Sequence, residues 1–288
     1  MSEDWSFAIR PMRPDDIEQA LCLSKDEGWN QTEKDWNLLL GNPLNICLVA
    51  ECNDRIAGTA TAIIHGDKVA WIGMVLVDKS LRGHGAGKML LTGIIDKLKH
   101  IESIKLDATP AGEPLYRKLG FKEEYRIFRM TNKSLSDLPA GEINREPLNT
   151  DPESLTEVLE LDKSIFGADR SYLLKALFHN YPHKSFILKQ NLRPDGYVFA
   201  RDGIRFNYIG PVCAHSAESA RVLISKTLRS LNNQLVALDI LQDKEETIKW
   251  LESIGFVKQR QFLRMYLKSN PHPGIVENQY LIGGPEFG

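Results

Sequence analysis

The sequence predicts an α/β protein that is built from two tandem copies of one topology. Strand and helix patterns alternate along residues 6–131, a stretch with the composition of a linker follows at 134–147, and short motifs of the first half recur in the second. The length of 288 residues agrees with two domains of ordinary size, which is about 100–200 residues each.

The first half contains helix signals and apolar strands in a regular order. Pro14 with two following aspartates and Thr32 are typical helix starts, and Asn53-Asp54 and Gly66-Asp67 are typical turns between strands. The expected strands are 6–10, 46–52, 56–64, 69–77, 104–108 and 124–130, and the expected helices are 14–23, 32–40, 85–100 and 114–119.

Three motifs recur in the same order in the second half, which indicates two copies of related topology. Their offsets of 137, 132 and 135 residues differ only as short loop changes would make them differ. The recurring pairs are Trp71-Ile72-Gly73 with Tyr208-Ile209-Gly210, Leu106-Asp107 with Leu238-Asp239, and Gly120-Phe121 plus Arg129-Met130 with Gly255-Phe256 plus Arg264-Met265.

The composition is that of a soluble globular protein, with 42% hydrophobic and 26% charged residues and a net charge of −2. A net charge of this sign and size does not favour binding to nucleic acid or to an anionic membrane. Cys22, Cys47, Cys52 and Cys213 lack the paired spacing of a zinc site, so we expect reduced thiols and no metal. Without a signal-peptide pattern or an apolar run of about 18 residues, we expect a cytoplasmic chain that does not span a membrane.

Residues 74–91 form an apolar strand, a short turn and a glycine-rich entry into an apolar helix. Such a turn points free backbone N–H groups and the positive end of a helix dipole at an anion, and Arg82 and Lys88 add full positive charges. A Walker A loop is excluded because Met89 follows Gly87-Lys88, and a dinucleotide fingerprint lacks its third glycine. The pattern predicts a phosphate or pyrophosphate ligand.

The motif Arg-Gly-x-Gly-x-Gly at 82–87, after a Leu/Val strand, resembles the pyrophosphate loop of the GNAT superfamily of acyl-CoA-dependent N-acetyltransferases. Pro114–Phe121 resembles the Leu-Tyr-x-Lys-x-Gly-Phe signature of that family, and the order of elements in 6–131 is similar to its fold. The resemblance implies two GNAT-like domains, each a mixed, mostly antiparallel sheet flanked by helices. We expect a catalytic acetyl-CoA-binding domain at 1–133, a linker at 134–147, a degenerate copy at 148–270 and a flexible tail at 271–288.

The resemblance also implies which residues bind the coenzyme. The strand before the loop would offer its backbone to the pantetheine arm, the loop would bind the pyrophosphate, and Thr109 and Lys118 would contact the arm and the 3′-phosphate. We expect the His84 side chain to point to solvent. The implied cofactor residues are Val75, Leu76, Val77, Arg82, Gly83, His84, Gly85, Ala86, Gly87, Lys88, Thr109, Tyr116 and Lys118.

Acyl transfer to an amine needs a proton donor for the thiolate and a base for the amine. Tyr116 is the expected donor, with packing against the coenzyme as the alternative reading. Many members of the family carry a glutamate on the strand before the loop, but residues 71–77 contain no acid. Asp107 is the first candidate for the base, and Glu27, His65 or a relay through water remain open.

The acceptor side is less defined by the sequence. Glu27 and Trp29 lie in the stretch that roofs the acceptor pocket in this fold, although Trp29 is equally readable as a staple between helices. Arg201, Tyr208 and Asp239 of the second copy are candidate substrate residues. The implied activity is acetyl-CoA-dependent N-acetylation of a small amine, such as an amino acid, polyamine or arylalkylamine, by a monomer or homodimer. Transfer of a longer acyl group and a non-catalytic acyl-CoA-binding regulatory module are the alternatives.

The second copy lacks the coenzyme residues of the first. At an offset of 137, the loop falls on Ser219, Ala220, Val222 and Ile224, and Leu251 stands in place of Tyr116. Side chains at these positions would block the approach of a phosphate to the backbone. We therefore expect no coenzyme there, and a role either as a wall of the substrate pocket or as a structural lid.

Overall fold

A computed structural model describes residues 5–132, 145–231 and 234–288, so most of the expected linker lies outside the described residues. A thirteen-stranded sheet runs through both halves of the described chain, in the order β1-β2-β3-β4-β5-β12-β6-β11-β13-β10-β9-β8-β7. Most neighbouring strands are antiparallel, whereas β4–β5 and β10–β11 are parallel. The predicted class, a mixed and mostly antiparallel sheet flanked by helices, is confirmed.

The first half contains strands and helices close to the ranges that the sequence predicts. Its strands are β1 (Ala8–Pro11), β2 (Ile46–Cys52), β3 (Arg55–His65), β4 (Val69–Val77), β5 (Ser103–Ala108) and β6 (Lys122–Asn132), and its helices are α1 (Ile17–Asp26), α2 (Glu33–Leu40), α3 (Ala86–Lys97) and α4 (Glu113–Lys118). A capping box between Thr32 and Asp35 begins α2. Asn53 and Asp54 both have positive φ, as the predicted turn requires.

The second half repeats this order and then adds a short strand at its end. Its strands are β7 (Leu148–Asn149), β8 (Ser185–Gln190), β9 (Arg193–Arg201), β10 (Asn207–Ala214), β11 (Val236–Leu241), β12 (Val257–Lys268) and β13 (Gln279–Leu281), and its helices are α5 (Pro152–Phe166), α6 (Ser171–Asn180), α7 (Ala217–Ser230) and α8 (Glu245–Ser253). Within the described ranges, no helix is long and apolar enough to cross a membrane.

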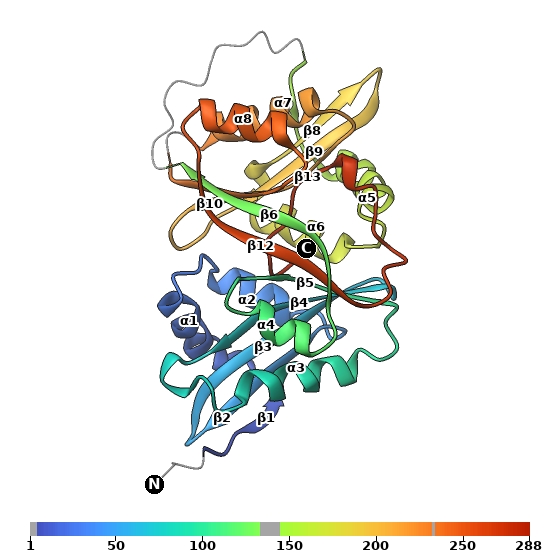
Figure 1. Cartoon of the computed structure of the whole chain (residues 1–288). Helices are drawn as coiled ribbons and strands as arrows, with labels where there is room; N and C mark the ends of the chain where they lie inside the picture. The colour runs from blue at the N-terminus through green and yellow to red at the C-terminus, as the bar shows by residue number, and fades with distance from the viewer. Residues whose placement is uncertain (1–4, 133–144, 232–233) are drawn as a thin grey trace.

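The two halves exchange a long strand with each other. β12 of the second half lies between β5 and β6, and β6 of the first half lies between β12 and β11. Figure 1 shows green β6 and orange-red β12 running side by side across the middle of the molecule. Each half thus completes its sheet with a strand of the other, and the halves form one interlocked sheet.

The exchange pairs the recurring Asp and Arg motifs across the halves. Arg264 on β12 lies opposite Asp107 on β5, with Nε–Oδ1 and Nη2–Oδ2 distances of 2.9 and 3.0 Å. Arg129 on β6 lies opposite Asp239 on β11, at 2.8 and 2.6 Å. All four residues are buried. These two reciprocal bidentate pairs therefore fasten the exchanged strands in register.

Helices cover both faces of the sheet. On one face α1, α2, α5 and α6 share one apolar cluster, in which Trp36 and Leu173 are fully buried. On the other face α3 and α4 cover the first half, and α7 and α8 cover the second. The shared cluster means that the core of one face continues from one half into the other.

The expected offset of 137 fails at the glycine-rich loop because the second copy has no such loop. Eight residues, 78–85, connect β4 to α3, whereas two residues, 215 and 216, connect β10 to α7. Ser219, Ala220, Val222 and Ile224 consequently lie inside α7. Leu251 is fully buried in α8, where it packs in the core.

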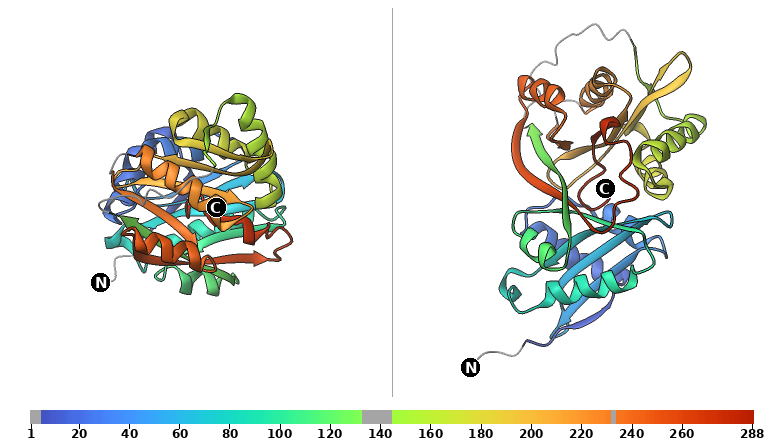
Figure 2. Two further views of the ribbon diagram at one scale, coloured as in Figure 1. Left: turned by 90° about the horizontal axis from the view of Figure 1, so that it is seen from above. Right: turned by 45° about the vertical axis from the view of Figure 1, so that its right-hand side comes forward.

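Residues 271–288 differ from the flexible tail that their glycines and prolines predict. β13 joins the sheet between β11 and β10, and Phe287 is fully buried. The segment then turns at Gly284, whose φ of +131° suits glycine, and ends at the junction of the halves (Figure 2, right). The glycines of this segment permit tight turns against buried partners. The same composition is also typical of a flexible linker, so composition alone does not distinguish the two.

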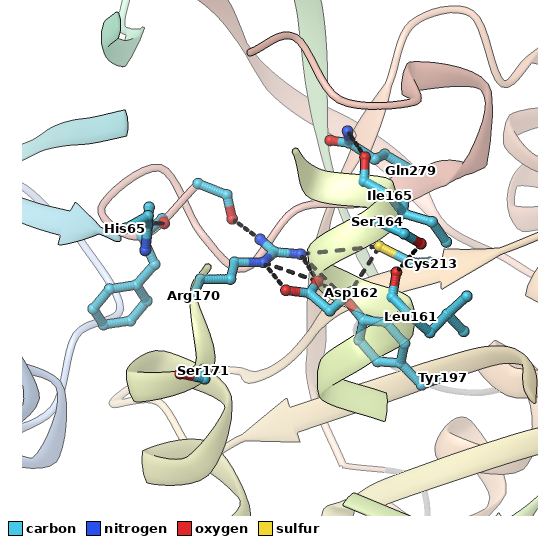
Figure 3. A network of polar contacts seen from close by, with 12 residues as sticks. His65, Leu161, Asp162, Ser164, Ile165, Arg170, Ser171, Tyr197, Cys213 and Gln279 are labelled. Carbon is cyan, nitrogen blue, oxygen red and sulfur yellow. Dashed lines mark hydrogen bonds and ion pairs between the residues drawn. The ribbon is translucent and has the colours of Figure 1, made fainter. Parts of the chain in front are cut away.

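Buried hydrogen-bond donors hold the end of this segment. Arg170 Nη1 donates to the Gly288 carbonyl at 2.9 Å, while the same guanidinium binds the Asp162 carboxylate (Figure 3). The His65 ring lies in the same region, and its Nε2 donates to the Phe287 carbonyl at 2.8 Å, since a carbonyl can only accept. Two side chains, one from each half, therefore fix the backbone of residues 287–288.

Burial lowers the pKa of His65 from 6.5 to about 3, so this side chain makes stability depend on pH. The folded pKa lies below the unfolded one, so its contribution is complete above pH 6.5 and is lost as the pH falls toward 3. Between pH 6 and 4 we expect the free energy of unfolding to fall by up to about 1.4 kcal/mol per pH unit more in the wild type than in His65→Gln. Urea titrations at each pH test this, and equal slopes in the two proteins would contradict it.

Candidate active site

Strand β4 separates from β5 halfway along its length. The parallel pairing runs from Val69 to Ile72 and stops there, while β3 still pairs with β4 as far as Val77. The separation begins at a bulge where Met74 has φ +49°, and Thr59 Oγ1 donates to the Met74 carbonyl at 2.7 Å. The β5-facing edge of residues 75–77 is consequently left open for a ligand.

The glycine-rich loop lies directly after this open edge. Gly83 and Gly85 have φ +86° and +95°, and Gly85 is the N-cap of the twelve-residue helix α3. No atom lies within 4 Å of the position that a Cβ would take at either glycine. Arg82 and Lys88 flank the loop. Open space thus lies next to both glycines, at the N-terminal end of α3 and beside two cations, where the first backbone N–H groups of a helix have no partner within the helix.

A cavity of about 610 Å³ joins the open edge and the loop to residues of both halves. This volume is in the range of small-molecule sites. The lining comprises Ile72–Val77, Leu81–Gly83, Gly85–Lys88, Leu106, Asp107, Thr109, Ala111, Gly112, Leu115, Tyr116 and Lys118 from the side of the glycine-rich loop, and Glu27, Trp29, Gln31, Arg129, Arg260, Phe262, Pro285 and Glu286 from the other.

Tyr116 on α4 is 9% exposed and lines the cavity. Gly112 allows this position, since a Cβ there would lie 2.8 Å from the Tyr116 ring. Burial raises the pKa of Tyr116 above its ordinary value, so the phenol keeps its proton at neutral pH. A protonated phenol at the wall of the cavity can donate a proton to an anion inside it.

Asp107, the first candidate for the base, lines the cavity but has both oxygens bound by Arg264. Burial raises the pKa of Asp107, and the Arg264 charge opposes that change. A carboxylate in a bidentate pair must break a charged hydrogen bond before it accepts a proton. The geometry therefore favours a structural role for Asp107, as the partner of Arg264 on the exchanged strand, over the role of a base.

Glu27 and Trp29 line the cavity as the sequence predicts. Arg82 donates to the Glu27 carboxylate, and Lys79 Nζ lies 3.6 Å from it. Glu27 therefore connects the segment after α1 to the start of the glycine-rich loop. Asn30 Oδ1 accepts from the backbone N–H groups of residues 205 and 206, both at 2.9 Å. These hydrogen bonds attach the segment that contains Trp29 and Asn30 to the second half.

Four predicted residues lie outside the lining. His84 is exposed, in agreement with the expected direction of its side chain, whereas Arg201, Tyr208 and Asp239 are buried. Tyr208 donates to Asp239 at 2.9 Å, beside Arg129. These residues of the second half support the wall of the cavity from behind.

The sequence analysis missed Gln31, Arg129, Arg260, Phe262, Pro285 and Glu286 as lining residues. Arg129 is part of a recurring motif, and this motif could have identified it. Arg260 and Phe262 lie on β12, and no local sequence pattern indicates that this strand reaches the cavity. Arg260 has no ion-pair partner within the described part of the chain. It therefore adds a positive charge to the wall.

Comparisons with known proteins agree with this geometry. Residues 13–121 match the "Acetyltransferase (GNAT) family" model, and residues 158–281 match an "Acetyltransferase (GNAT) domain" model. Holothin acyltransferase from Pseudoalteromonas sp. (strain SANK 73390) is 27% identical over 258 residues, which are 84% of each chain. A glucosamine 6-phosphate N-acetyltransferase from Trypanosoma brucei brucei is 36% identical over 84 residues, which are 26% of this chain and 57% of that protein.

Solved structures show the same fold. A proposed acetyltransferase from Pyrococcus horikoshii superposes with a TM-score of 0.80 at 24% identity, over 98% of this chain and 96% of that one. A tandem GNAT protein from the clavulanic acid biosynthesis pathway superposes with a TM-score of 0.61 at 13% identity, over 91% and 98%. With both halves matched by family models, this chain belongs to the GNAT acetyltransferases as a tandem member, and it is an acyltransferase.

Proposed function

We propose that this chain is an acetyl-CoA-dependent N-acetyltransferase that acts on a small-molecule amine. The observation that carries the proposal is a single cavity, which is lined by the open edge of β4, the glycine-rich loop at Gly83 and Gly85, and the protonated phenol of Tyr116. These three features answer the three needs of acyl transfer, which are an anchored donor, a polarised carbonyl and a proton for the leaving thiolate.

The residues at the loop suit a diphosphate. Space next to Gly83 and Gly85 lies in front of the N–H groups of α3, and Arg82 and Lys88 supply positive charge. When bound, acetyl-CoA supplies an acyl group that is activated as a thioester. In this proposal Lys118 contacts its 3′-phosphate and Thr109 its pantetheine arm.

The open edge of β4 would hold the reacting group. Backbone groups of residues 75–77 that face this edge pair with the pantetheine amides, and the N–H of Leu76 or its neighbour polarises the thioester carbonyl. Tyr116 then donates its proton to the departing sulfur. Each of these contacts is a proposal that a ligand-bound structure tests.

The acceptor end of the cavity favours an amine that also carries an anionic group. Arg260 lacks a described ion-pair partner there, and Trp29 offers an aromatic face. Amino acids and amino-sugar phosphates combine an amine with an anion, and a relative matched over 84 residues is named as acting on glucosamine 6-phosphate. These amines join polyamines and arylalkylamines as candidates.

A thiol-release screen with acetyl-CoA against panels of these amines tests the proposed function. We expect release that depends on the amine, with product mass increased by one acetyl group. Because a relative is named as holothin acyltransferase, propionyl- and hexanoyl-CoA are run in parallel, and faster release with them would favour a longer acyl group. Binding of acetyl-CoA without release for any amine would favour the regulatory module instead.

Tyr116→Phe is expected to lower kcat by a factor of about 10 to 10³ with little change in affinity for CoA, because it removes only the proton donor. Stopped assays with the amine found in the screen, together with CoA titration, measure both quantities. Tyr266→Phe makes the same chemical change outside the cavity and should leave kcat unchanged. Equal turnover in Tyr116→Phe and wild type would remove Tyr116 from the chemistry.

A further inference from the structure

The segment after β12 closes the second half and then enters the cavity of the first. β13 inserts between β10 and β11, where Leu281 pairs with Val212 on one side and Ile240 on the other. This gap in the second half corresponds to the open gap between β4 and β5. One strand of the chain thus fills the empty equivalent site, and the residues that follow it cross to β4.

The crossing brings Glu286 against the bulge of β4. A Cβ at Gly73 would lie 2.6 Å from the Glu286 Cα and 3.1 Å from its Cβ, so only glycine permits this approach. Trp71 Nε1 donates to the Pro285 carbonyl at 3.2 Å, on the same strand. Glu286 therefore occupies space next to the strand that carries no acid of its own.

The Glu286 carboxylate is held at one oxygen and unpartnered at the other. Arg201 Nη2 donates to Oε1 at 2.6 Å, and Arg201 Nη1 donates to the Gly283 carbonyl at 2.6 Å. Oε2 is buried and has no hydrogen-bond partner among the residues that the structure describes. Glu286 lines the cavity, and Oε2 is the carboxylate oxygen that is left without a partner.

The charges around Glu286 favour a carboxylate that can take up a proton. Arg201 also contacts Asp35, with Nε 3.1 Å from Oδ1, so one guanidinium serves two buried carboxylates. Burial raises the pKa of Glu286, Arg201 opposes the change, and Asp35 adds to it. Arg129 and the phenol of Tyr208 are the other titratable groups that face it.

We propose that Glu286 is the general base of the acyl transfer and is delivered to β4 by a segment outside the first domain. The inference rests on the proposed function. When the acceptor amine attacks the thioester carbonyl carbon, the C–N bond forms and the C–S bond breaks. The amine proton passes to Glu286 Oε2, the Tyr116 proton passes to the thiolate, and the proton on Glu286 returns to the tyrosinate through solvent.

Glu286→Gln tests the proposal, because the amide can still accept from Arg201 but cannot take a proton. With the amine found in the screen, we expect kcat/KM to fall by a factor of about 10² to 10⁴ and to recover about tenfold per pH unit as the amine deprotonates in solution. Protection by CoA in a thermal-shift assay should stay unchanged. Glu277→Gln, on an exposed residue of the same segment, should match the wild type throughout.

A second readout does not depend on turnover. Infrared difference spectra between wild type and Glu286→Gln should contain one carboxyl band that titrates above the ordinary range of glutamate. If Glu286→Gln fails to fold, Glu286→Asp replaces it, and slowed turnover with the acidic limb of the pH profile retained is expected. Wild-type activity in Glu286→Gln or Glu286→Asp, or the absence of the raised band, would overturn the role of Glu286. An inactive wild type would overturn the proposed function together with the role of Glu286, whereas an active wild type and an equally active Glu286→Gln would overturn only the role of Glu286.

Discussion

Gly85→Val is expected to abolish the protection that acetyl-CoA gives the wild type in a thermal-shift assay. A valine side chain would fill the space in front of the first turn of α3, where no atom now lies within 4 Å of the Cβ position. At a coenzyme concentration 100 times the Kd, the wild type should gain about 2.7 kcal/mol of stability, and the variant should gain none. Unchanged protection would move the coenzyme site away from this loop.

The backbone strain of this substitution needs its own control. Gly85 has φ +95°, where a β-branched residue is strained, so Gly85→Val also lowers stability without ligand. Gly66→Val provides the match, because Gly66 has φ +64° in the β3–β4 turn, outside the cavity, and its Cβ would make only ordinary contacts. We expect Gly66→Val to be destabilised yet fully protected by acetyl-CoA. Loss of protection in both variants would attribute the effect to strain.

Asp239→Asn is expected to lower the free energy of unfolding by about 3–5 kcal/mol, because it leaves the Arg129 guanidinium buried without its counter-charge. Asp239 is fully buried and binds Arg129 through both oxygens across the exchanged strand. Urea unfolding at neutral pH measures the loss. A loss below 1 kcal/mol would show that the reciprocal pairs do not fasten the exchange.

An exposed ion pair provides the comparison for this prediction. Glu113 pairs with Arg117 at 2.8 Å, and their side chains are 29% and 44% exposed. Exposed pairs of this kind contribute about 0.3–0.5 kcal/mol. Glu113→Gln should therefore change stability by less than 1 kcal/mol, which isolates burial as the cause of the larger loss.

Local structure and the glycine-rich loop could be predicted because their signals are local. The apolar strand before Asp78, the positive-φ glycines and the first turn of α3 are consecutive in the sequence, so their residue types report directly on backbone geometry. Tyr116 was likewise identified from a short motif and lines the cavity. Such features need no knowledge of which strands become neighbours.

The exchange of β6 and β12 could not be predicted in the same way. The recurring motifs place an Asp on β5 and β11 and an Arg on β6 and β12, and pairing within a half satisfies them as well as pairing across halves. Strand order is decided by contacts between residues more than 100 positions apart, such as Asp107 with Arg264. Arg201 and Asp239 were accordingly expected in the cavity and instead support its wall.

The segment 271–288 was the least predictable part of the site. Its glycines and prolines suggest freedom, but Gly274 and Gly288 lie at close approaches, where a Cβ would be 2.5 Å from the Ile165 carbonyl oxygen and 2.7 Å from the Trp71 ring. The lack of an acid on β4 is visible in the sequence, but the local candidates for the base, Asp107, Glu27 and His65, lie elsewhere in the first half. Glu286 lies next to β4 because β13 inserts between β11 and β10 and directs the following residues there. No local sequence pattern predicts this insertion.

A crystal structure of the chain with acetyl-CoA tests the central claim most directly. We predict the diphosphate within hydrogen-bond distance of the backbone N–H groups between residues 83 and 88, with the thioester between Tyr116 and Glu286. Diphosphate density in the second half, or anywhere other than this turn, would contradict the account.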